Sequence, residues 1–393
     1  QTFNNANLGI ALGANTSFTS NSTGALRFGG TLASFANGGF TLTLNGTSTS
    51  ASNAISEPIS GTGGLTKDGS GTWRLGGTHT YSGTTNIGTA AGASGGTLIT
   101  TANNVLPSTT VNIFGGTLNY NTRTDTIGAL NLGGGASGTT AAVAGTTGTL
   151  TLGGNVAYDA TNNPNGATIS GNLALGANRI LTIGDSSAAA ADLSISSVIS
   201  GVGFGITKSG TGTLALSGAN TYTGTTTISQ GTIQLNANAP SGAAGTLGNA
   251  ASAVTINDGS TGANNTALLI GTTGVTVGRA ITVANSGTGT TTLGGSITSG
   301  TGTFTGAITL GKSGSLAADG TSNITFSTGV ISGTGGITKT GTGTVTLSGA
   351  NTYSGTSSVS AGTLQIGNAG TTGALGTGAV TNDANLTFNR TNA

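Results

Sequence analysis

Short runs in which apolar and polar residues alternate recur along the whole chain. In TLTL, residues 41–44, Leu42 and Leu44 point to one side of an extended chain and the threonines point to the other. This period of two is typical of a half-buried strand. Glycine or asparagine clusters end the runs, because these residues accept the backbone angles of tight corners. No convincing stretch has apolar residues at helical spacing, so the pattern predicts an all-β chain with little or no helix.

One stretch of the chain occurs in three versions, at residues 59–98, 199–235 and 331–366. Each version contains a lysine followed 14 residues later by a tyrosine, and the pairs are Lys67 with Tyr81, Lys208 with Tyr222, and Lys339 with Tyr353. The lysines are 141 and then 131 residues apart. A constant inner spacing combined with a variable outer spacing indicates a repeated structural unit, which is the sequence signature of a solenoid.

Equivalent apolar positions inside the copies give the length of one coil. They are 19, 19 and 23 residues apart in the pairs Leu216 and Leu235, Leu347 and Ile366, and Leu75 and Leu98. We interpret this interval as one coil of three short strands, paired in parallel with the next coil at ~4.8 Å. The chain is therefore expected to form a right-handed parallel β-helix (β-solenoid) of roughly 19–20 coils. We expect one continuous solenoid over residues 1–393, with wider loops at residues 133–148 and 236–252.

The sequence of the three copies also resembles that of a known family. The motif G-x-G-G-[LI]-T-K-x-G-x-G-T-x-x-L-x-G-x-N-T-Y-[ST]-G-T is similar to the autotransporter-associated β-strand repeat, also called the passenger-associated transport repeat. That repeat occurs in secreted passenger domains of bacterial autotransporters, so the resemblance implies a β-helical architecture and export to the cell surface. It implies no catalytic residue. The first copy has His79 where the others have Asn220 and Asn351, and the second copy has one extra residue in GVGFGITK.

Composition narrows the class of protein further. Charged residues make up 5% of the chain and the net charge is +1, so we expect neither nucleic acid nor anionic lipid as a partner. The chain has no cysteine, which excludes disulfides and thiolate chemistry, and no run of 18 apolar residues that could span a membrane. It also has no methionine, which suggests a processed or excised piece whose signal peptide is absent. We expect a location outside the cell or on the bacterial outer surface.

Acidic side chains are too scattered to predict an active site. The nine acidic residues are Glu57, Asp68, Asp125, Asp159, Asp185, Asp192, Asp258, Asp319 and Asp383. Glycoside hydrolysis needs two facing carboxylates, and no acidic pair has the spacing of one coil. We therefore expect isolated, solvated turn aspartates. His79 is the only histidine and is expected to be a turn residue, so the sequence predicts no catalytic, cofactor-binding or metal site.

The repeat lysines and the aromatic residues leave two interpretations open. Lysines such as Lys67 could contact acidic glycans, or they could be exposed turn residues, which we favour. Trp73 and the repeat tyrosines could stack on sugar rings, or they could pack on the surface or in the core of the rod, which we favour.

Neither end of the chain looks capped, since QTFNNANLGIAL at the start and ANLTFNRTNA at the end both read as strands. A solenoid normally covers its terminal coils. We therefore expect either a piece of a longer solenoid or a subunit that associates end to end with copies of itself.

The function predicted from these observations is structural. We expect a non-enzymatic, stiff β-helical rod at the bacterial surface, for which stacking into a filament is the natural assembly. The alternative is a surface adhesin, as in autotransporter passengers, that binds glycans or a host receptor. A third and more distant alternative is a polysaccharide-degrading β-helix, because that fold includes such enzymes.

Overall fold

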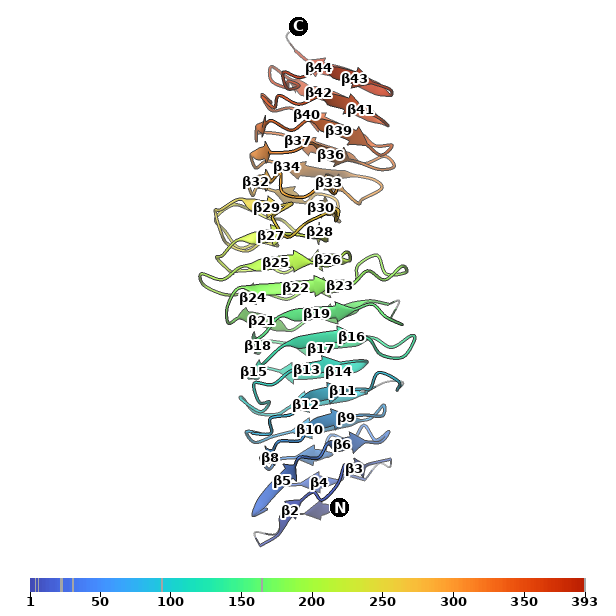
Figure 1. Cartoon of the computed structure of the whole chain (residues 1–393), viewed down its shortest axis with the longest axis vertical. Helices are drawn as coiled ribbons and strands as arrows, with labels where there is room; N and C mark the ends of the chain where they lie inside the picture. The colour runs from blue at the N-terminus through green and yellow to red at the C-terminus, as the bar shows by residue number, and fades with distance from the viewer. Residues whose placement is uncertain are drawn as a thin grey trace. The chain divides into compact units, whose positions relative to one another are not determined.

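The fold was analysed in a computed structural model, which describes residues 1–3, 5, 7–21, 24–29, 32–92, 95–163 and 165–391. These residues form short strands, labelled β1–β44, and no helix, as the alternating pattern predicted. Accordingly, the described part of the chain contains no helix that could cross a membrane. The chain divides into two compact units, Gln1–Ser200 and Gly201–Ala393. Each unit is a stack of coils in which the chain returns repeatedly to the same parallel sheets (Figure 1).

The coils of the first unit have three sides, each formed by a parallel sheet, and we number the sheets in the order in which the chain passes through them. Sheet 1 contains β1 (Thr2–Phe3), β4 (Arg27–Phe28), β7 (Ala54–Ile55), β10 (Thr72–Leu75), β12 (Thr97–Thr100), β14 (Gly116–Asn121), β17 (Ala141–Gly145), β20 (Ala167–Ile169) and β23 (Leu193–Ile195). Sheet 2 has two separate groups, β2 (Gly9–Ala11), β5 (Ser34–Gly38) and β8 (Ile59–Gly61), then β15 (Thr124–Ile127), β18 (Thr149–Leu152), β21 (Asn172–Leu175) and β24 (Ile199–Ser200). Sheet 3 contains β3 (Thr16–Thr19), β6 (Leu42–Asn45), β9 (Leu65–Lys67), β11 (Thr85–Ile87), β13 (Val111–Ile113), β16 (Leu130–Gly133), β19 (Val156–Asp159) and β22 (Arg179–Ile183).

The second unit has three sides of the same kind. Its sheet 1 contains β26 (Thr213–Leu216), β28 (Gly231–Leu235), β30 (Thr266–Ile270), β33 (Thr291–Gly295), β36 (Gly314–Ala317), β39 (Ile337–Thr340), β41 (Ser357–Val359) and β43 (Val380–Asn382). Its sheet 2 contains β31 (Thr276–Val277), β34 (Thr301–Phe304), β37 (Asn323–Phe326), β40 (Thr344–Leu347), β42 (Thr363–Gly370) and β44 (Asn385–Arg390). Its sheet 3 contains β25 (Ile206–Ser209), β27 (Thr226–Ile228), β29 (Val254–Ile256), β32 (Ile281–Val283), β35 (Ile308–Leu310) and β38 (Ile331–Gly333).

The interior of each unit is a stack of aliphatic side chains. Strand β6 is typical: Leu42 and Leu44 are fully buried, whereas the residues between and after them are half-buried. Successive coils pair residue for residue and in parallel, so a buried position lies above a buried position of the coil below. The parallel β-helix expected from the sequence is therefore confirmed.

The coils vary more in length than the repeat suggested. The register confirms the predicted coil length in two copies, because Leu216 pairs with Leu235 and Leu347 pairs with Ile366, but the predicted three strands per coil are wrong there, because each of these coils has two. The third prediction is wrong: Leu98 pairs with Trp73 rather than with Leu75, because a loop widens that coil. Other coils are wider still, such as the one that runs from β28 to its paired strand β30 and contains both the loop residues 236–252 and strand β29. The chain therefore makes about 15 turns rather than 19–20.

Of the two wide loops expected from the sequence, one is confirmed and one is partly wrong. Residues 236–252 contain no strand. The other segment, residues 133–148, is interrupted by strand β17 (Ala141–Gly145), so its wide loop is limited to residues 134–140 and a short turn follows at residues 146–148.

Coils formed by the repeat have two strands instead of three. In the first copy the chain alternates between sheets 3 and 1 through β9, β10, β11 and β12, and the described residues of sheet 2 resume only at β15. In the third copy the alternation is between sheets 1 and 2, through β39 to β42, and sheet 3 has ended at β38. The repeat therefore leaves out sheet 2 in the first copy and sheet 3 in the third.

Candidate functional site: the lysine–tyrosine repeat

The lysine of each repeat points into the coil. Lys67 lies at the end of β9 and is fully buried, and its Nζ donates hydrogen bonds to the carbonyl oxygens of Asp68, Gly69 and Gly95 at 2.7, 2.8 and 2.9 Å. Two of these carbonyls belong to the turn that follows the lysine, and the third belongs to the next coil. The ammonium group thus ties a turn to the coil that stacks on it.

The other two copies have the same arrangement. Lys208 Nζ donates to the carbonyls of Ser209, Gly210 and Gln230 at 2.9, 2.7 and 3.1 Å, and Lys339 Nζ donates to those of Thr340, Gly341 and Ala361 at 2.7, 2.7 and 3.1 Å. Both lysines are also 0% exposed. We call the three sites the lysine cradles.

Glycine two residues after each lysine makes the cradle possible. Gly69, Gly210 and Gly341 have φ of 68°, 72° and 76°, in the left-handed region that side chains disfavour. The Lys-x-Gly sequence is thus the local signal for a turn whose last two carbonyls face back to the lysine.

Burial lowers the pKa of two of these lysines. It lowers the pKa of Lys67 to about 8, and the nearby Asp68 carboxylate partly opposes the shift. The pKa of Lys339 is lowered for the same reason, with Asp319 opposing. Carbonyl dipoles at hydrogen-bond distance compensate for the lost water.

The repeat tyrosine fills the side of the coil where the third strand is missing. Tyr81, Tyr222 and Tyr353 are all buried, and each hydroxyl pairs with the hydroxyl four residues later. These pairs are Tyr81 with Thr85 at 2.6 Å, Tyr222 with Thr226 at 2.8 Å, and Tyr353 with Ser357 at 2.6 Å. Burial raises the pKa of all three tyrosines, so their hydroxyls stay protonated.

The residue two positions before the tyrosine closes the sheet that ends there. In the third copy Asn351 Oδ1 accepts the Ile331 N–H of β38 at 2.9 Å, and Asn351 Nδ2 donates to the Ala374 carbonyl at 2.8 Å. In the first copy His79 Nδ1 accepts the Ile59 N–H of β8 at 2.9 Å. The prediction that His79 replaces the asparagine of the other copies is thus confirmed, and the structure shows how an imidazole can do so.

The prediction for the repeat lysines is wrong, whereas the favoured prediction for the aromatic residues, that they pack against the coils, is confirmed. The repeat lysines are neither exposed turn residues nor glycan contacts. They are buried, and their ammonium groups are surrounded by backbone carbonyls that come together only in the folded coil. Trp73 is buried and its Nε1 donates to the Asn45 carbonyl at 3.1 Å, so neither its ring nor those of the repeat tyrosines can stack on a sugar.

Two aspartates also differ from the expectation of solvated turn residues. Asp125 is fully buried and its Oδ1 accepts the N–H groups of Val105 and Leu106 at 2.6 and 2.9 Å. Asp192 is buried and accepts the Ser186 N–H at 2.7 Å. Both carboxylates organise loops. Across the described ranges, no group of three or more His, Cys, Asp or Glu side chains could hold a metal ion.

Sequence reasoning missed a buried arginine. Arg279 is fully buried in the second unit, and its guanidinium group donates to the carbonyls of Leu247 and Ser252 at 2.6 and 2.5 Å. Burial lowers its pKa. Arg279 stabilises the wide loop at residues 236–252, and no local sequence motif predicts its burial.

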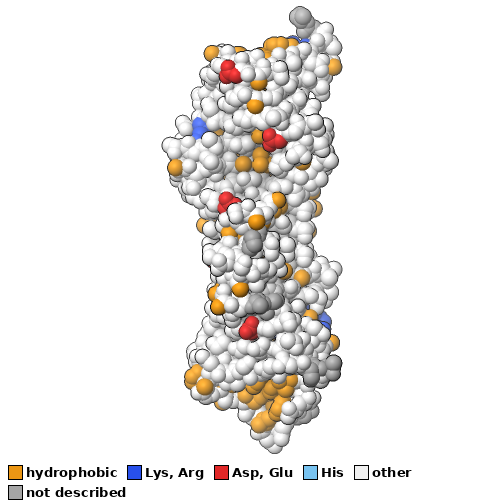
Figure 2. All heavy atoms as spheres, turned by 90° about the vertical axis from the view of Figure 1, so that its right-hand side faces the viewer, with side chains coloured by type: hydrophobic (Ala, Val, Ile, Leu, Met, Phe, Trp, Pro, Cys, Tyr) orange, Lys and Arg blue, Asp and Glu red, His pale blue; other side chains and the backbone are white. Residues whose placement is uncertain are grey.

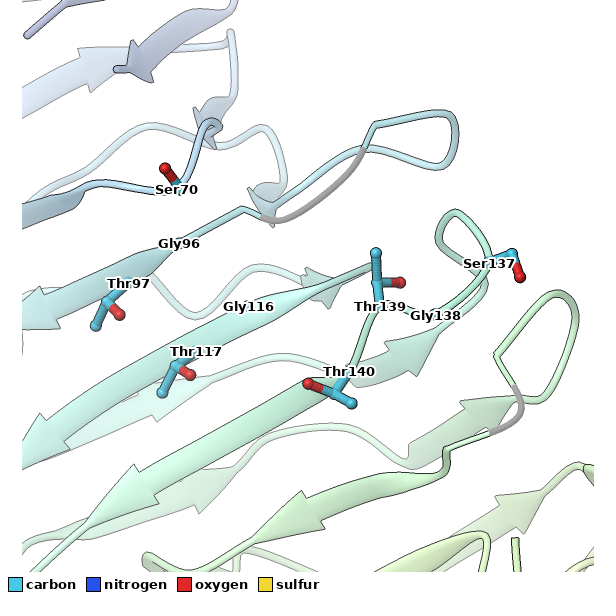
Figure 3. A pocket seen from close by; sticks show the side chains of 9 residues that line it. All are labelled: Ser70, Gly96, Thr97, Gly116, Thr117, Ser137, Gly138, Thr139 and Thr140. Atoms are coloured by element: carbon cyan, nitrogen blue, oxygen red, sulfur yellow. The ribbon is translucent and has the colours of Figure 1, made fainter. Parts of the chain in front are cut away.

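A shallow groove of about 560 Å³ lies on the first unit (Figure 3). Thr97 and Thr117 from neighbouring strands of sheet 1 form one part, and the loop with Ser137 and Thr139 forms another. The lining contains only glycine, serine and threonine, so the groove offers hydroxyls and backbone groups and no charge. On the face drawn in Figure 2, charged side chains lie singly rather than in patches.

Comparison with protein families gives one result. A model described as the passenger-associated-transport-repeat matches residues 65–92, 206–235 and 337–366, which are the segments that form the lysine cradles and tyrosine turns. No curated protein and no solved structure gave a match. The chain therefore carries three passenger-associated-transport repeats, and these repeats and the parallel β-solenoid fit an autotransporter passenger domain.

Proposed function

We propose that the chain is a non-enzymatic structural element of a secreted bacterial surface protein, and that it serves as a stiff β-solenoid. The observation that supports this most is that the polar groups of the repeat side chains form hydrogen bonds within the solenoid. The lysine ammonium and tyrosine hydroxyl groups of the repeats bond to the coils themselves and are buried. The repeat thereby builds coils and offers no reactive group to a ligand.

Electron microscopy of the purified chain in negative stain would test the proposal. We expect straight, unbranched particles of constant width, and round or flexible particles would contradict it. Incubation with a panel of polysaccharides would test the enzymatic alternative, for which we expect no turnover.

End-to-end association with a second copy is a finer proposal, and the last coil of the second unit supports it. Val380 and Phe388 are 47% and 69% exposed, although they pair in register with the buried Ser357 and Ile366 of the coil below. They continue the stack of interior positions. A coil from a second copy would cover them and pair with the free edges of β43 and β44, and such a contact would propagate into a filament.

Sedimentation velocity over a range of concentrations would test the association. We expect particles that grow with concentration, and Phe388→Lys should abolish the growth because it puts a charge into the contact. Thr292→Lys, on the outer face of sheet 1, is the matched control. A monomer at all concentrations would refute the association and leave the structural proposal intact.

The groove supports a second candidate function, an adhesin that binds neutral glycans. Its hydroxyls and backbone groups could hydrogen-bond sugar hydroxyls, and its lack of charge favours an uncharged ligand. On a glycan array, Thr97→Val and Thr117→Val should reduce binding, whereas Thr292→Val on the second unit should not. No binding by the unmodified chain would refute this function.

A further inference from the structure

The first repeat closes β8 with a titratable group. Residues 78–83, which we call the closing segment, run beside this last strand of the first sheet 2 group. The N–H of Thr80 donates to the Ile59 carbonyl at 2.8 Å, and the N–H of Ser82 donates to the Gly61 carbonyl at 2.9 Å. The remaining bond is the one from the Ile59 N–H to His79 Nδ1. The closing segment thus covers the edge of β8, and His79 supplies one of its contacts.

The direction of this bond fixes the protonation state of the imidazole. Because the Ile59 N–H is a donor, His79 Nδ1 must be unprotonated, and the single proton of the neutral ring is on Nε2. His79 is 2% exposed, and Nε2 has no hydrogen-bond partner among the described residues. A second proton would have to bind Nδ1. It would break the bond to Ile59, set two donors against each other and leave a buried charge without water.

The titratable groups around His79 offer little compensation. The Tyr81 ring lies 6.1 Å from the imidazole, and its hydroxyl stays protonated. Asp125 is connected to His79 through Val105. The Val105 N–H donates to the Asp125 carboxylate, and the Val105 carbonyl accepts the backbone N–H of His79 at 3.1 Å. Burial raises the pKa of Asp125, so this carboxylate also takes up a proton as the pH falls. Burial lowers the pKa of His79 to about 4.

The third repeat shows the same closure without a titratable group. Asn351 Oδ1 accepts the Ile331 N–H at the same 2.9 Å as His79 Nδ1 accepts that of Ile59. A carboxamide does not change its charge with pH, so the third closure is insensitive to acid.

We propose that the first repeat is an acid-labile latch: as the solution becomes acidic, protonation of His79 favours opening of the closing segment, and the edge of β8 becomes available for pairing more often. The latch goes beyond the structural function proposed above and does not depend on where the chain is located. The freed edge presents unpaired backbone groups of residues 59–61, which can accept an extended strand.

Hydrogen exchange at single-amide resolution would test the latch in the intact chain. For a folded-state pKa of about 4 and an unfolded value of 6.5, opening at pH 5 should be about 30-fold more favourable than at neutral pH. The amides of Ile59 and Thr80 should therefore exchange about 30-fold faster in the unmodified chain than in His79→Asn at pH 5, and equally fast at pH 7.5. Equal exchange of the two proteins at pH 5 would overturn the proposal.

Two further measurements keep the test independent of any folding defect in His79→Asn. In Asn351→His, exchange of the Ile331 amide should become dependent on acid, and the first repeat serves as the internal reference. Unchanged exchange of the Ile331 amide at pH 5 would count against the mechanism. Since His79 is the only histidine, an NMR titration of the unmodified chain reports on it directly. We expect the proton on Nε2 and a midpoint near pH 4, and an ordinary midpoint near pH 6.5 would overturn the proposal.

Discussion

Replacing Lys67 by methionine removes one lysine cradle while nearly preserving the side-chain volume. Three carbonyl oxygens, those of Asp68, Gly69 and Gly95, then lose a charged donor inside the coil. A hydrogen bond to a charged group contributes about 1.5–3 kcal/mol, and an unsatisfied buried carbonyl carries a comparable cost. Relief from burying the ammonium group offsets part of this loss. We therefore expect Lys67→Met to lower the free energy of unfolding by about 3–5 kcal/mol.

Urea denaturation followed by tryptophan fluorescence is a suitable assay. Trp73, the only tryptophan, is buried in β10, the strand that follows the first cradle, so its emission reports on the coil that loses the cradle. The control is Arg123→Met, which also removes one positive charge but at an exposed position, and it should stay within about 0.5 kcal/mol of the unmodified chain. An equally small effect for Lys67→Met would show that the cradle does not stabilise the coil, and the reasoning would be refuted.

Three further predictions concern the tyrosine turn, the close approach of coils and acid stability. Tyr222→Phe should cost about 1 kcal/mol in urea denaturation, because Thr226 loses its buried hydroxyl partner; an unchanged midpoint would contradict this. Gly355→Ala should cost about 1–3 kcal/mol, because a Cβ there would overlap the backbone of the preceding coil, whereas Gly259→Ala, which meets no neighbour, should be neutral; equal effects would contradict the packing. The folded-state pKa of His79, about 4, lies below its unfolded value of 6.5, so stability is complete above pH 6.5 and falls as the pH drops towards 4. The full loss, reached below pH 4, is about 3 kcal/mol, and denaturation at pH 7.5 and 4.5 should show about 2.5 kcal/mol of it in the unmodified chain but not in His79→Asn.

Local patterns predicted the strands well, because an alternating run determines which residues face the interior whatever the coil length. Leu347 and Ile366 show this most clearly, since their spacing in the sequence gave the register of β40 and β42. The same reasoning failed for Leu75 and Leu98, where the loop between β11 and β12 widens the coil. Loop length is not encoded in strand periodicity, so the number of turns was overestimated.

The interior of the repeat was harder to predict, because it depends on contacts between coils. A lysine such as Lys208 normally lies at the surface, and only the converging carbonyls of Gly210 and Gln230 make its burial favourable. The Lys-x-Gly sequence holds part of the signal, through the left-handed turn at the glycine. The third carbonyl comes from the next coil, which no local motif describes. The use of different sides of the coil by the second and third copies was equally invisible in the sequence, because their wording is nearly the same.

Chemical labelling of amino groups in the folded chain, read by mass spectrometry, tests the central claim most directly. The chain has four lysines, and the account predicts rapid labelling of the exposed amino group of Gln1 and slower labelling of the half-buried Lys312, whose Nζ donates to the carbonyls of Gly287 and Gly289. Lys67, Lys208 and Lys339 should stay unlabelled until the chain is denatured, because each ammonium group is enclosed by carbonyls. Labelling of Lys67, Lys208 and Lys339 in the folded chain as rapidly as the amino group of Gln1 would contradict the account.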